Sequence, residues 1–171
     1  MAGRSQQGRE SWQWTVRASS LGELAIAISP EGVCQVSFDP PRQIREGIGP
    51  ESPRMKAWAD GVVEQVERPG IARDLPLCVG GTAFQQLVWR RLQAIPPGTT
   101  MSYGELAREL GRPGSARAVA SACAANALAV VVPCHRVLRG DGGLGGYRWG
   151  LERKQELLRR ERDARSAPRQ A

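Results

Sequence analysis

The chain has 171 residues, which is enough for one or two small domains with a buried core. No run approaches the ~18 consecutive apolar residues of a membrane span, and the N-terminus lacks the apolar segment of a signal peptide. Its four cysteines are widely spaced, and a single histidine argues against an ordinary zinc site. These features predict a cytoplasmic protein with reduced thiols, no metal and no membrane partner.

Charge is unevenly distributed along the chain. Residues 1–80 carry 9 Lys and Arg against 10 Asp and Glu, whereas residues 81–171 carry 15 against 7. The two parts therefore have formal charges of −1 and +8, which together give the +7 of the chain. The basic charge of the second half favours an anionic polymer as the binding partner, and nucleic acid is the first candidate. The alternative is that arginine only solubilises the surface, since Lys56 and Lys154 are the only lysines.

Three short strands are predicted near the N-terminus. Trp12, Trp14 and Val16 alternate with polar neighbours, as in a half-buried strand. Two apolar runs, 24–28 and 33–38, follow after turn signals. The pattern predicts a three-stranded antiparallel meander.

A loop, a helix and a linker are predicted next. Residues 39–53 contain four prolines and two glycines, which favours a loop. Apolar residues recur at helical spacing over 55–66, and residues 75–81 have the composition of a linker. The polar ends of the chain, 1–10 and 164–171, are expected to be disordered. Nothing in the first part suggests chemistry.

Two capping boxes predict helix starts in the second part. Thr82 and Gln85 precede a helix with an apolar face, and Ser102 and Glu105 start a shorter helix. A Gly-containing turn then leads to an Ala-rich helix over residues 115–125. Two helices joined by such a turn follow the pattern of a helix-turn-helix unit.

The Ala-rich helix is unusual for a reader of the DNA major groove, because Arg117 is its only long polar side chain. An Ala-rich ridge with one arginine suits close backbone approach in the minor groove. The alternative is a core helix whose arginine extends to water. The only asparagine, Asn126, follows this helix and is expected to tie two turns together.

The stretch 130–136 combines a buried-strand pattern with two reactive side chains. Its three valines predict a strand, which Pro133 ends because proline has no N–H for the ladder. Cys134 and the only histidine, His135, follow. Adjacent side chains on extended backbone point to opposite faces, so a water would have to connect the imidazole with the thiol. A structural cysteine beside an exposed histidine is the equally simple alternative.

This stretch and four others resemble the O6-alkylguanine-DNA alkyltransferases, which directly reverse alkylation damage. The nucleophile motif of that family matches Pro133-Cys134-His135-Arg136, and the similarity runs from about Gly81 to Glu161. The other blocks, in matching order, are Thr82-Ala83-Phe84-Gln85, Ser102-Tyr103, Ala116-Arg117-Ala118-Val119 and Gly146-Tyr147-Arg148-Trp149-Gly150. The chain is similar to the C-terminal half of bacterial adaptive-response alkyltransferases.

Pattern and resemblance together predict the fold class. We expect an N-terminal α/β domain with an antiparallel sheet and a helix, which with its linker occupies residues 11–80. A mainly α-helical domain with a winged-helix-like helix-turn-helix is expected over residues 81–163, carrying both DNA binding and the active site.

The resemblance assigns roles to single residues. It makes Cys134 the nucleophile and alkyl acceptor, His135 its base through a water, and Glu161 the group that orients His135. Tyr103 is the proton donor to the leaving guanine, and Arg117 fills the stack when the base flips out. Further residues expected at DNA or in the pocket are Ser102, Ala116, Ala118, Ala120, Ser121, Asn126, Pro133, Arg136, Val137, Tyr147, Arg148, Trp149 and Lys154.

Finer expectations concern the pocket itself. The carbonyls of Cys134 and Val137 are expected to accept from the guanine amino group, and the Arg148 N–H is expected to face O6. The indole of Trp149 is expected to narrow the pocket mouth. Cys123 lies in the DNA-binding helix, so no second cysteine is expected close to the nucleophile.

The implied reaction is one irreversible transfer of a methyl or other alkyl group to Cys134. The donor is O6 of guanine, and also O4 of thymine, in double-stranded DNA; no cofactor is needed and the protein is expected to be a monomer. The thioether product should be less stable, because the charge arranged around the thiol is lost. Three alternatives stay open: a cysteine hydrolase, a DNA-binding regulator and a non-catalytic alkyltransferase-like protein.

Overall fold

The computed structural model describes residues 12–70 and 74–166. The expected disorder at 1–10 and 167–171 lies outside these residues. The strands are β1 (Gln13–Arg17), β2 (Leu24–Ser29), β3 (Gly32–Phe38), β4 (Met101–Ser102) and β5 (Val137–Leu138). The helices are α1 (Arg42–Glu46), α2 (Pro53–Glu67), α3 (Ala83–Gln93), α4 (Tyr103–Glu109), α5 (Ala116–Ala124), the 3-10 turn η1 (Cys134–Arg136) and α6 (Leu151–Ser166).

The N-terminal sheet is an antiparallel meander in the order β1-β2-β3, so that prediction is confirmed. All six residues of the central strand β2 are buried, because strands pair with both of its edges and α2 packs on the sheet. The pairing of β2 with β3 shifts between Ala27 and Ile28, which leaves Cys34 as the additional residue of a β-bulge.

The expectation of a continuous loop over 39–53 is wrong, because α1 forms inside it. Pro41 supplies the extended residue before the helix, with φ of −65°. Arg42 donates to Glu46 one turn later at 2.6 Å, a spacing that stabilises short helices. The predicted helix over 55–66 is confirmed as α2, and Ser52 caps it by accepting from Met55 N at 3.2 Å.

Both predicted capping boxes are formed. Thr82 and Gln85 exchange hydrogen bonds of 3.2 and 2.9 Å at the start of α3. Ser102 and Glu105 exchange bonds of 3.1 and 2.7 Å at the start of α4. Ser115 holds the N-cap position of α5 but makes no side-chain cap bond. The boxes fix where α3 and α4 begin. The second box therefore also fixes the position of Tyr103, the first residue of α4.

The predicted strand over 130–132 is wrong, because the chain there makes two tight turns. The first bends at Val130, whose φ of 66° is left-handed, with a hydrogen bond of 2.7 Å between the flanking residues. The second bends at Pro133, whose φ of −80° and ψ of 63° are those of an inverse γ-turn closed by a 2.8 Å bond. Cys134 and His135 therefore belong to a 3-10 turn, and the extended backbone assumed for them is also wrong.

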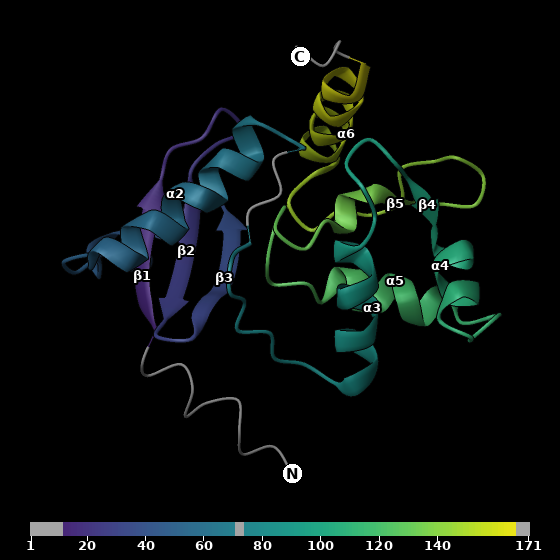
Figure 1. Cartoon of the computed structure of the whole chain (residues 1–171), viewed down its shortest axis with the longest axis horizontal. Helices are drawn as coiled ribbons and strands as arrows, with labels where there is room; N and C mark the ends of the chain where they lie inside the picture. The colour runs from purple at the N-terminus through teal and green to yellow at the C-terminus, as the bar shows by residue number, and fades with distance from the viewer. Residues whose placement is uncertain (1–11, 71–73, 167–171) are drawn as a thin grey trace.

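Figure 1 shows the sheet with α2 across it, α3, α4 and α5 beyond its β3 edge, and α6 at the top of the view. One hydrophobic cluster runs from the sheet through α2 to the residues around α3, α5 and α6. The turn η1 contacts α3 and α6, and β5 pairs with β4 in parallel. Within the described residues, no helix is long and apolar enough to cross a membrane.

The last helix is longer than expected. Residues 164–166 were predicted to be disordered but belong to α6. Arg159 donates to Asp163 at 2.5 Å, and Arg165 donates to the carbonyl of Gly98 at 3.2 Å. The first bond lies within α6, and the second holds the final turn against the connection that follows α3.

We predict unequal effects of the same truncation at two isoleucines. Ile26 in β2 is fully buried, whereas Ile48 is 41% exposed. Ile26→Ala should lower the free energy of unfolding by about 2–5 kcal/mol through lost burial and the cavity left behind. Ile48→Ala should change it by less than about 0.5 kcal/mol. Urea unfolding at constant m-value measures both, and equal losses would contradict the central place of β2.

Candidate active site

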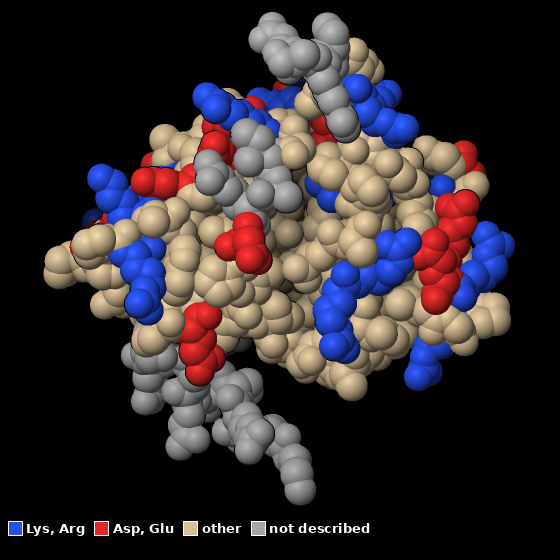
Figure 2. All heavy atoms as spheres, in the orientation of Figure 1, with Lys and Arg blue, Asp and Glu red and all other residues tan. Residues whose placement is uncertain are grey.

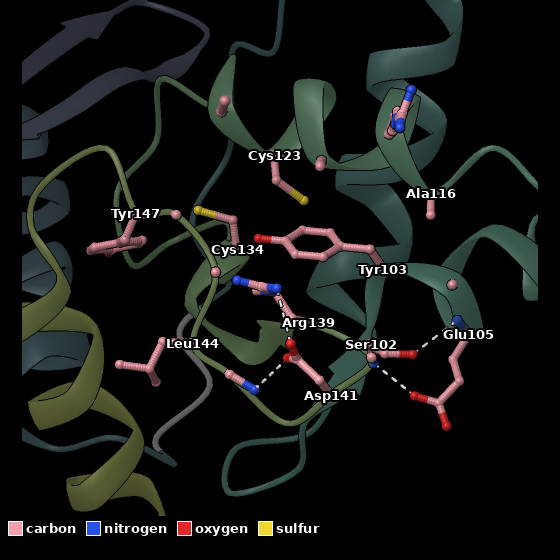
Figure 3. A pocket seen from close by; sticks show the side chains of 18 of the residues that line it. Ser102, Tyr103, Glu105, Ala116, Cys123, Cys134, Arg139, Asp141, Leu144 and Tyr147 are labelled. Carbon is pink, nitrogen blue, oxygen red and sulfur yellow. Dashed lines mark hydrogen bonds and ion pairs between the residues drawn. The ribbon is translucent and has the colours of Figure 1, made fainter.

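A pocket of about 1470 Å³ opens between α4, α5 and the loop that precedes α6. The walls of this pocket, here called the Cys134 pocket, come from three segments: Ser102, Tyr103, Gly104, Glu105 and Arg108; Ala116, Arg117, Ala120, Cys123 and Ala124; Arg139, Gly140, Asp141, Gly143, Leu144, Gly145, Gly146, Tyr147, Arg148 and Leu151, with Cys134 at its base. Figure 3 shows the Tyr103 hydroxyl pointing toward the sulfurs of Cys123 and Cys134.

The Cys134 thiol is almost fully buried, with 6% of the residue exposed. Burial raises the pKa of this thiol, while a hydrogen bond from Asn126 and the charge of Lys154 act in the opposite direction. The Asn126 amide donates to the sulfur at 3.3 Å. The group at rest is therefore a neutral thiol that faces the pocket.

Asn126 organises the two turns before the thiol. Its amide nitrogen donates to the carbonyls of Val132 at 2.8 Å and Leu128 at 3.3 Å, and its oxygen accepts from Leu128 N at 2.9 Å. The same side chain thus holds the entrance of the first turn, the second turn and the sulfur. A fully buried amide with all of these partners is satisfied and rigid.

Behind Cys134 lies a buried cluster of His135, Arg136 and Glu161. Nε2 of His135 is 2.8 Å from a Glu161 oxygen. Arg136 donates to the carboxylate through Nε at 3.1 Å and Nη2 at 2.9 Å, and Gly98 N donates at 3.0 Å. Burial opposes ionisation of Glu161, but the hydrogen bonds from His135 and Arg136 and the charge of Arg136 prevail and lower its pKa to about 2.

This cluster determines which ring nitrogen of His135 carries the proton. Burial lowers the pKa of the imidazole, so it is neutral near pH 7. An ionised Glu161 can only accept, which places the imidazole proton on Nε2 and a lone pair on Nδ1. Among the described residues, His135 Nδ1 and Tyr147 Oη are the buried side-chain N and O atoms without a hydrogen-bond partner. The free lone pair is the feature that a general base needs.

Two tyrosines stand on opposite sides of the thiol. Burial, followed by the nearby thiols, raises the pKa of Tyr103 to about 12, so this hydroxyl keeps its proton. A Cβ at Gly145 would lie 3.0 Å from that hydroxyl, and both this close approach and the φ of 66° favour glycine at the position. The Tyr147 ring meets the His135 ring edge-on, with centroids 6.5 Å apart.

Lys154 pins the loop of the pocket from inside. Its ammonium is fully buried and donates to the carbonyls of Val137 at 2.7 Å, Gly146 at 3.3 Å and Leu144. Burial lowers the pKa of Lys154. The Val137 carbonyl, expected to accept from guanine, therefore already has one donor.

The predicted site residues separate into three groups in the structure. Ser102, Tyr103, Ala116, Arg117, Ala120, Cys134, Tyr147 and Arg148 line the Cys134 pocket. Ala118 and Ser121 are exposed on α5 outside it. The third group lies outside the pocket lining and surrounds the turn that carries Cys134: Asn126, Pro133, His135, Arg136, Val137, Lys154 and Glu161.

Two expectations about this pocket are corrected. Trp149 does not line it: the indole is 8% exposed and packs edge-on against Tyr147, with centroids 5.3 Å apart. Cys123 was expected to lie away from the nucleophile but shares the pocket with it. The spacing of Ala116, Ala120 and Cys123 already places them on one helical face, so the sequence contained this signal.

The rim contains basic residues that sequence reasoning missed. Arg108 and Arg139 both line the pocket. Arg139 pairs with Asp141 at 2.9 Å within the loop. Arg108 lies on α4 and Arg139 lies in the loop after β5, and none of the sequence motifs includes either residue.

Comparison with known proteins agrees with the motifs. Residues 83–163 match the family model described as 6-O-methylguanine DNA methyltransferase, DNA binding domain. The bifunctional transcriptional activator/DNA repair enzyme Ada of Escherichia coli K12 is 49% identical over 82% of this chain and 43% of its own length. The methylated-DNA--protein-cysteine methyltransferase of Mycolicibacterium paratuberculosis is 55% identical over 52% of this chain and 54% of its own.

The chain thus spans about half the length of these curated relatives. A solved structure, Mycobacterium tuberculosis OGT in complex with DNA, is matched over 89% of this chain and 94% of that one. The TM-score is 0.77 and the sequence identity is 35%. Motifs, fold and this near-complete coverage agree, and the chain belongs to the O6-methylguanine-DNA methyltransferase family.

Proposed function

We propose that this protein repairs DNA by direct reversal, as a methylated-DNA--[protein]-cysteine S-methyltransferase that acts once. The observation that carries the proposal is a buried thiol at the base of an open pocket, backed by a neutral imidazole with a free lone pair. Two curated relatives are named as a DNA repair enzyme and as a methylated-DNA--protein-cysteine methyltransferase, and a solved relative was crystallised with DNA.

The proposed reaction is a single displacement at the alkyl carbon. The Cys134 proton passes through a water to His135 Nδ1, the sulfur bonds to the carbon, and the carbon–O6 bond breaks. Tyr103 gives a proton to the departing guanine, for which its raised pKa of about 12 keeps the hydroxyl protonated. No cofactor takes part. Because burial disfavours a resting thiolate, proton removal accompanies attack rather than preceding it.

DNA would lie along α5. We propose that α4, the turn at residues 111–114 and α5 form a winged-helix-like helix-turn-helix within an active domain of residues 81–163, preceded by an α/β domain of residues 11–80. The exposed face of α5 carries small side chains and Arg117, which suits close approach in a minor groove. On the face in Figure 2, basic side chains lie over α3, in the part of the chain whose net charge is +8.

Arg117 would replace the extruded base in the stack, with Ser102 and residues 116–121 along the backbone. The partner is double-stranded DNA that contains O6-alkylguanine, with O4-alkylthymine as a second substrate. We also propose that the protein acts as a monomer in the cytoplasm. Its four unpaired thiols are consistent with a reducing compartment.

The decisive experiment mixes the full chain with a duplex that contains O6-methylguanine. We expect a gain of about 14 Da, one methyl group in place of the thiol proton. Trypsin releases Cys123 and Cys134 in the same peptide, residues 118–136, so fragment ions must locate the methyl group. Repaired guanine plotted against protein should plateau at one equivalent, because a thioether offers water no electrophilic carbonyl.

Two serine variants serve as the matched pair for that experiment. Cys134→Ser should retain DNA binding and lose transfer, whereas Cys123→Ser should still take up one methyl group at Cys134. Undiminished transfer by Cys134→Ser, or turnover well past one equivalent, would overturn the proposal. A duplex-independent hydrolytic activity would favour a cysteine hydrolase instead.

A second prediction separates base extrusion from general charge attraction. Arg117→Ala should slow repair of duplex DNA at least tenfold more than dealkylation of free O6-benzylguanine, because the free base needs no extrusion. Arg112→Ala is the control, since Arg112 is an exposed arginine of the turn before α5 that lies over Phe84. Equal slowing of duplex repair by both variants would contradict a role in extrusion.

Tyr103→Phe should slow both duplex repair and dealkylation of free O6-benzylguanine, because the leaving guanine needs a proton in either reaction.

The buried carboxylate gives a prediction for pH. The pKa of Glu161 is about 2 in the folded protein, below the ~4.3 of an unfolded chain. Ionised Glu161 therefore stabilises the fold above pH ~4.3, and this contribution fades as the pH falls toward 2. Glu161→Gln should cost on the order of 3 kcal/mol at pH 7 and progressively less below pH 4. Urea unfolding across this range measures the difference.

Glu156→Gln is the control for that series. Its carboxylate pairs with Arg159 and Arg160 on the solvent side of the same helix, where water screens ion pairs. The control should lose clearly less stability than Glu161→Gln at pH 7. A Glu161→Gln loss that stays constant between pH 7 and pH 2 would show that shape rather than charge matters.

A further inference from the structure

A second cavity, of about 650 Å³, shares no lining residue with the Cys134 pocket. It opens between β3, the segment that leads into α3 and the turn that follows α5. Two cysteines, Cys34 and Cys78, line it together with Gln35, Trp89 and Asn126. The proposed repair reaction uses neither thiol.

Backbone pairing places these two cysteines side by side. Val33 N donates to Pro76 O at 2.8 Å, and Cys78 N donates to Val33 O at 2.9 Å. These bonds make a parallel bridge between Val33 and Leu77, so the next residue on each segment is Cys34 or Cys78. Figure 1 shows the segment before α3 running beside β3.

Such neighbours meet the distance requirement for a disulfide. Paired strands lie ~4.8 Å apart, and disulfides join Cα atoms that are ~4.4–6.8 Å apart. The approach is unusually close here, because a Cβ at Gly32 would lie only 2.2 Å from Pro76 O. Glycine at position 32, with φ of 148°, permits it.

The two thiols differ in accessibility. Cys34 is 4% exposed and its sulfur donates to Gly32 O at 3.4 Å. Burial above all raises its pKa to about 11, and the neighbouring Cys78 thiol adds to the effect. Cys78 is half-buried and lines the cavity. A small oxidant in water therefore reaches Cys78 first, and Cys34 stands beside it as the second thiol.

We propose that Cys34 and Cys78 form a thiol-modification site that takes an intramolecular disulfide under hydrogen peroxide. The Cys78 thiolate attacks one oxygen of hydrogen peroxide, the O–O bond breaks, and the sulfur becomes a sulfenic acid. The other oxygen leaves as hydroxide and takes up the proton that the Cys78 thiol released, which gives the first water. The Cys34 sulfur attacks the Cys78 sulfur, the S–S bond forms, and the sulfenic oxygen departs as water with the Cys34 proton. In sum, two thiols and one peroxide give one disulfide and two waters.

The disulfide would close the chain between β3 and the segment before α3. It would fasten that segment to the sheet at the second cavity, whose lining does not include Cys134. Cys123 and Cys134 are both buried and share the other pocket, so they are slower competitors for peroxide. The inference concerns thiol chemistry alone and does not depend on the proposed repair function.

The sequence provides a clean assay for the cross-link. Trypsin separates Cys34 in peptide 18–42 from Cys78 in peptide 74–90, and leaves Cys123 and Cys134 together in peptide 118–136. The full, reduced chain is treated with one to a few equivalents of hydrogen peroxide, its remaining thiols are blocked, and it is digested without reductant. We expect peptides 18–42 and 74–90 to appear joined, about 2 Da lighter than their sum, before peptide 118–136 changes.

Three variants complete the design. Cys34→Ser and Cys78→Ser should each abolish the cross-link, whereas Cys123→Ser should leave it unchanged. The oxidised parent chain should unfold about 5 °C or more higher than the reduced chain, and dithiothreitol should reverse the shift.

The parent chain alone can overturn the inference, whatever the folding of the variants. Oxidation that enters peptide 118–136 while peptides 18–42 and 74–90 stay separate would do so. Disulfide-linked dimers in place of the internal cross-link would do so as well.

Discussion

The ionised carboxylate of Glu161 is the constraint on which the rest of the site depends. A buried charge is tolerated only when it is paired and hydrogen-bonded, and here His135, Arg136 and Gly98 N share that task. These partners come from the turn η1 and from the connection after α3, so one side chain of α6 fixes both. Gly98 has φ of 75°, and a Cβ there would come within 3.0 Å of the Glu161 carbonyl. The His135 imidazole thus takes its position and its tautomer from the core.

The thiol is aimed by backbone turns rather than by strong bonds to its own sulfur. Val130, a β-branched residue, sits at φ of 66°, a conformation that costs of order 1–3 kcal/mol. The Asn126 amide offsets that cost by bonding both turns. A regular strand would have buried the valines equally well, but it would not have turned Cys134 toward the pocket between α5 and the loop. The strained conformation of Val130 therefore serves to direct Cys134 toward the pocket.

Local rules predicted what is locally determined, and they failed where position depends on contacts across the fold. Period-two alternation and capping boxes gave the meander and the starts of α3 and α4, because neighbouring residues determine both. The run 130–132 was mistaken for a strand because buried turns and buried strands share an apolar pattern. The order of motifs identified His135 and Glu161 together, but it could not show that Trp149 packs behind Tyr147.

The proposed limit of one repair per molecule could have two causes: no second thiol near Cys134, or a stable bond between Cys134 and the alkyl group. The first cause does not apply, since Cys123 and Cys134 line the same pocket. Burial, followed by the nearby Cys134 thiol, raises the pKa of Cys123 to about 12, which makes it a poor nucleophile. Removing the alkyl group from the thioether would also require Cys134 to leave as a thiolate from an unactivated alkyl carbon, so under the proposed reaction the group would stay on Cys134. The expected loss of stability then has a different cause, because the resting thiol carries no charge to lose. An added methyl group must fit where Cys134 is 6% exposed and Asn126 donates to its sulfur, so alkylation acts directly on the amide that holds both turns.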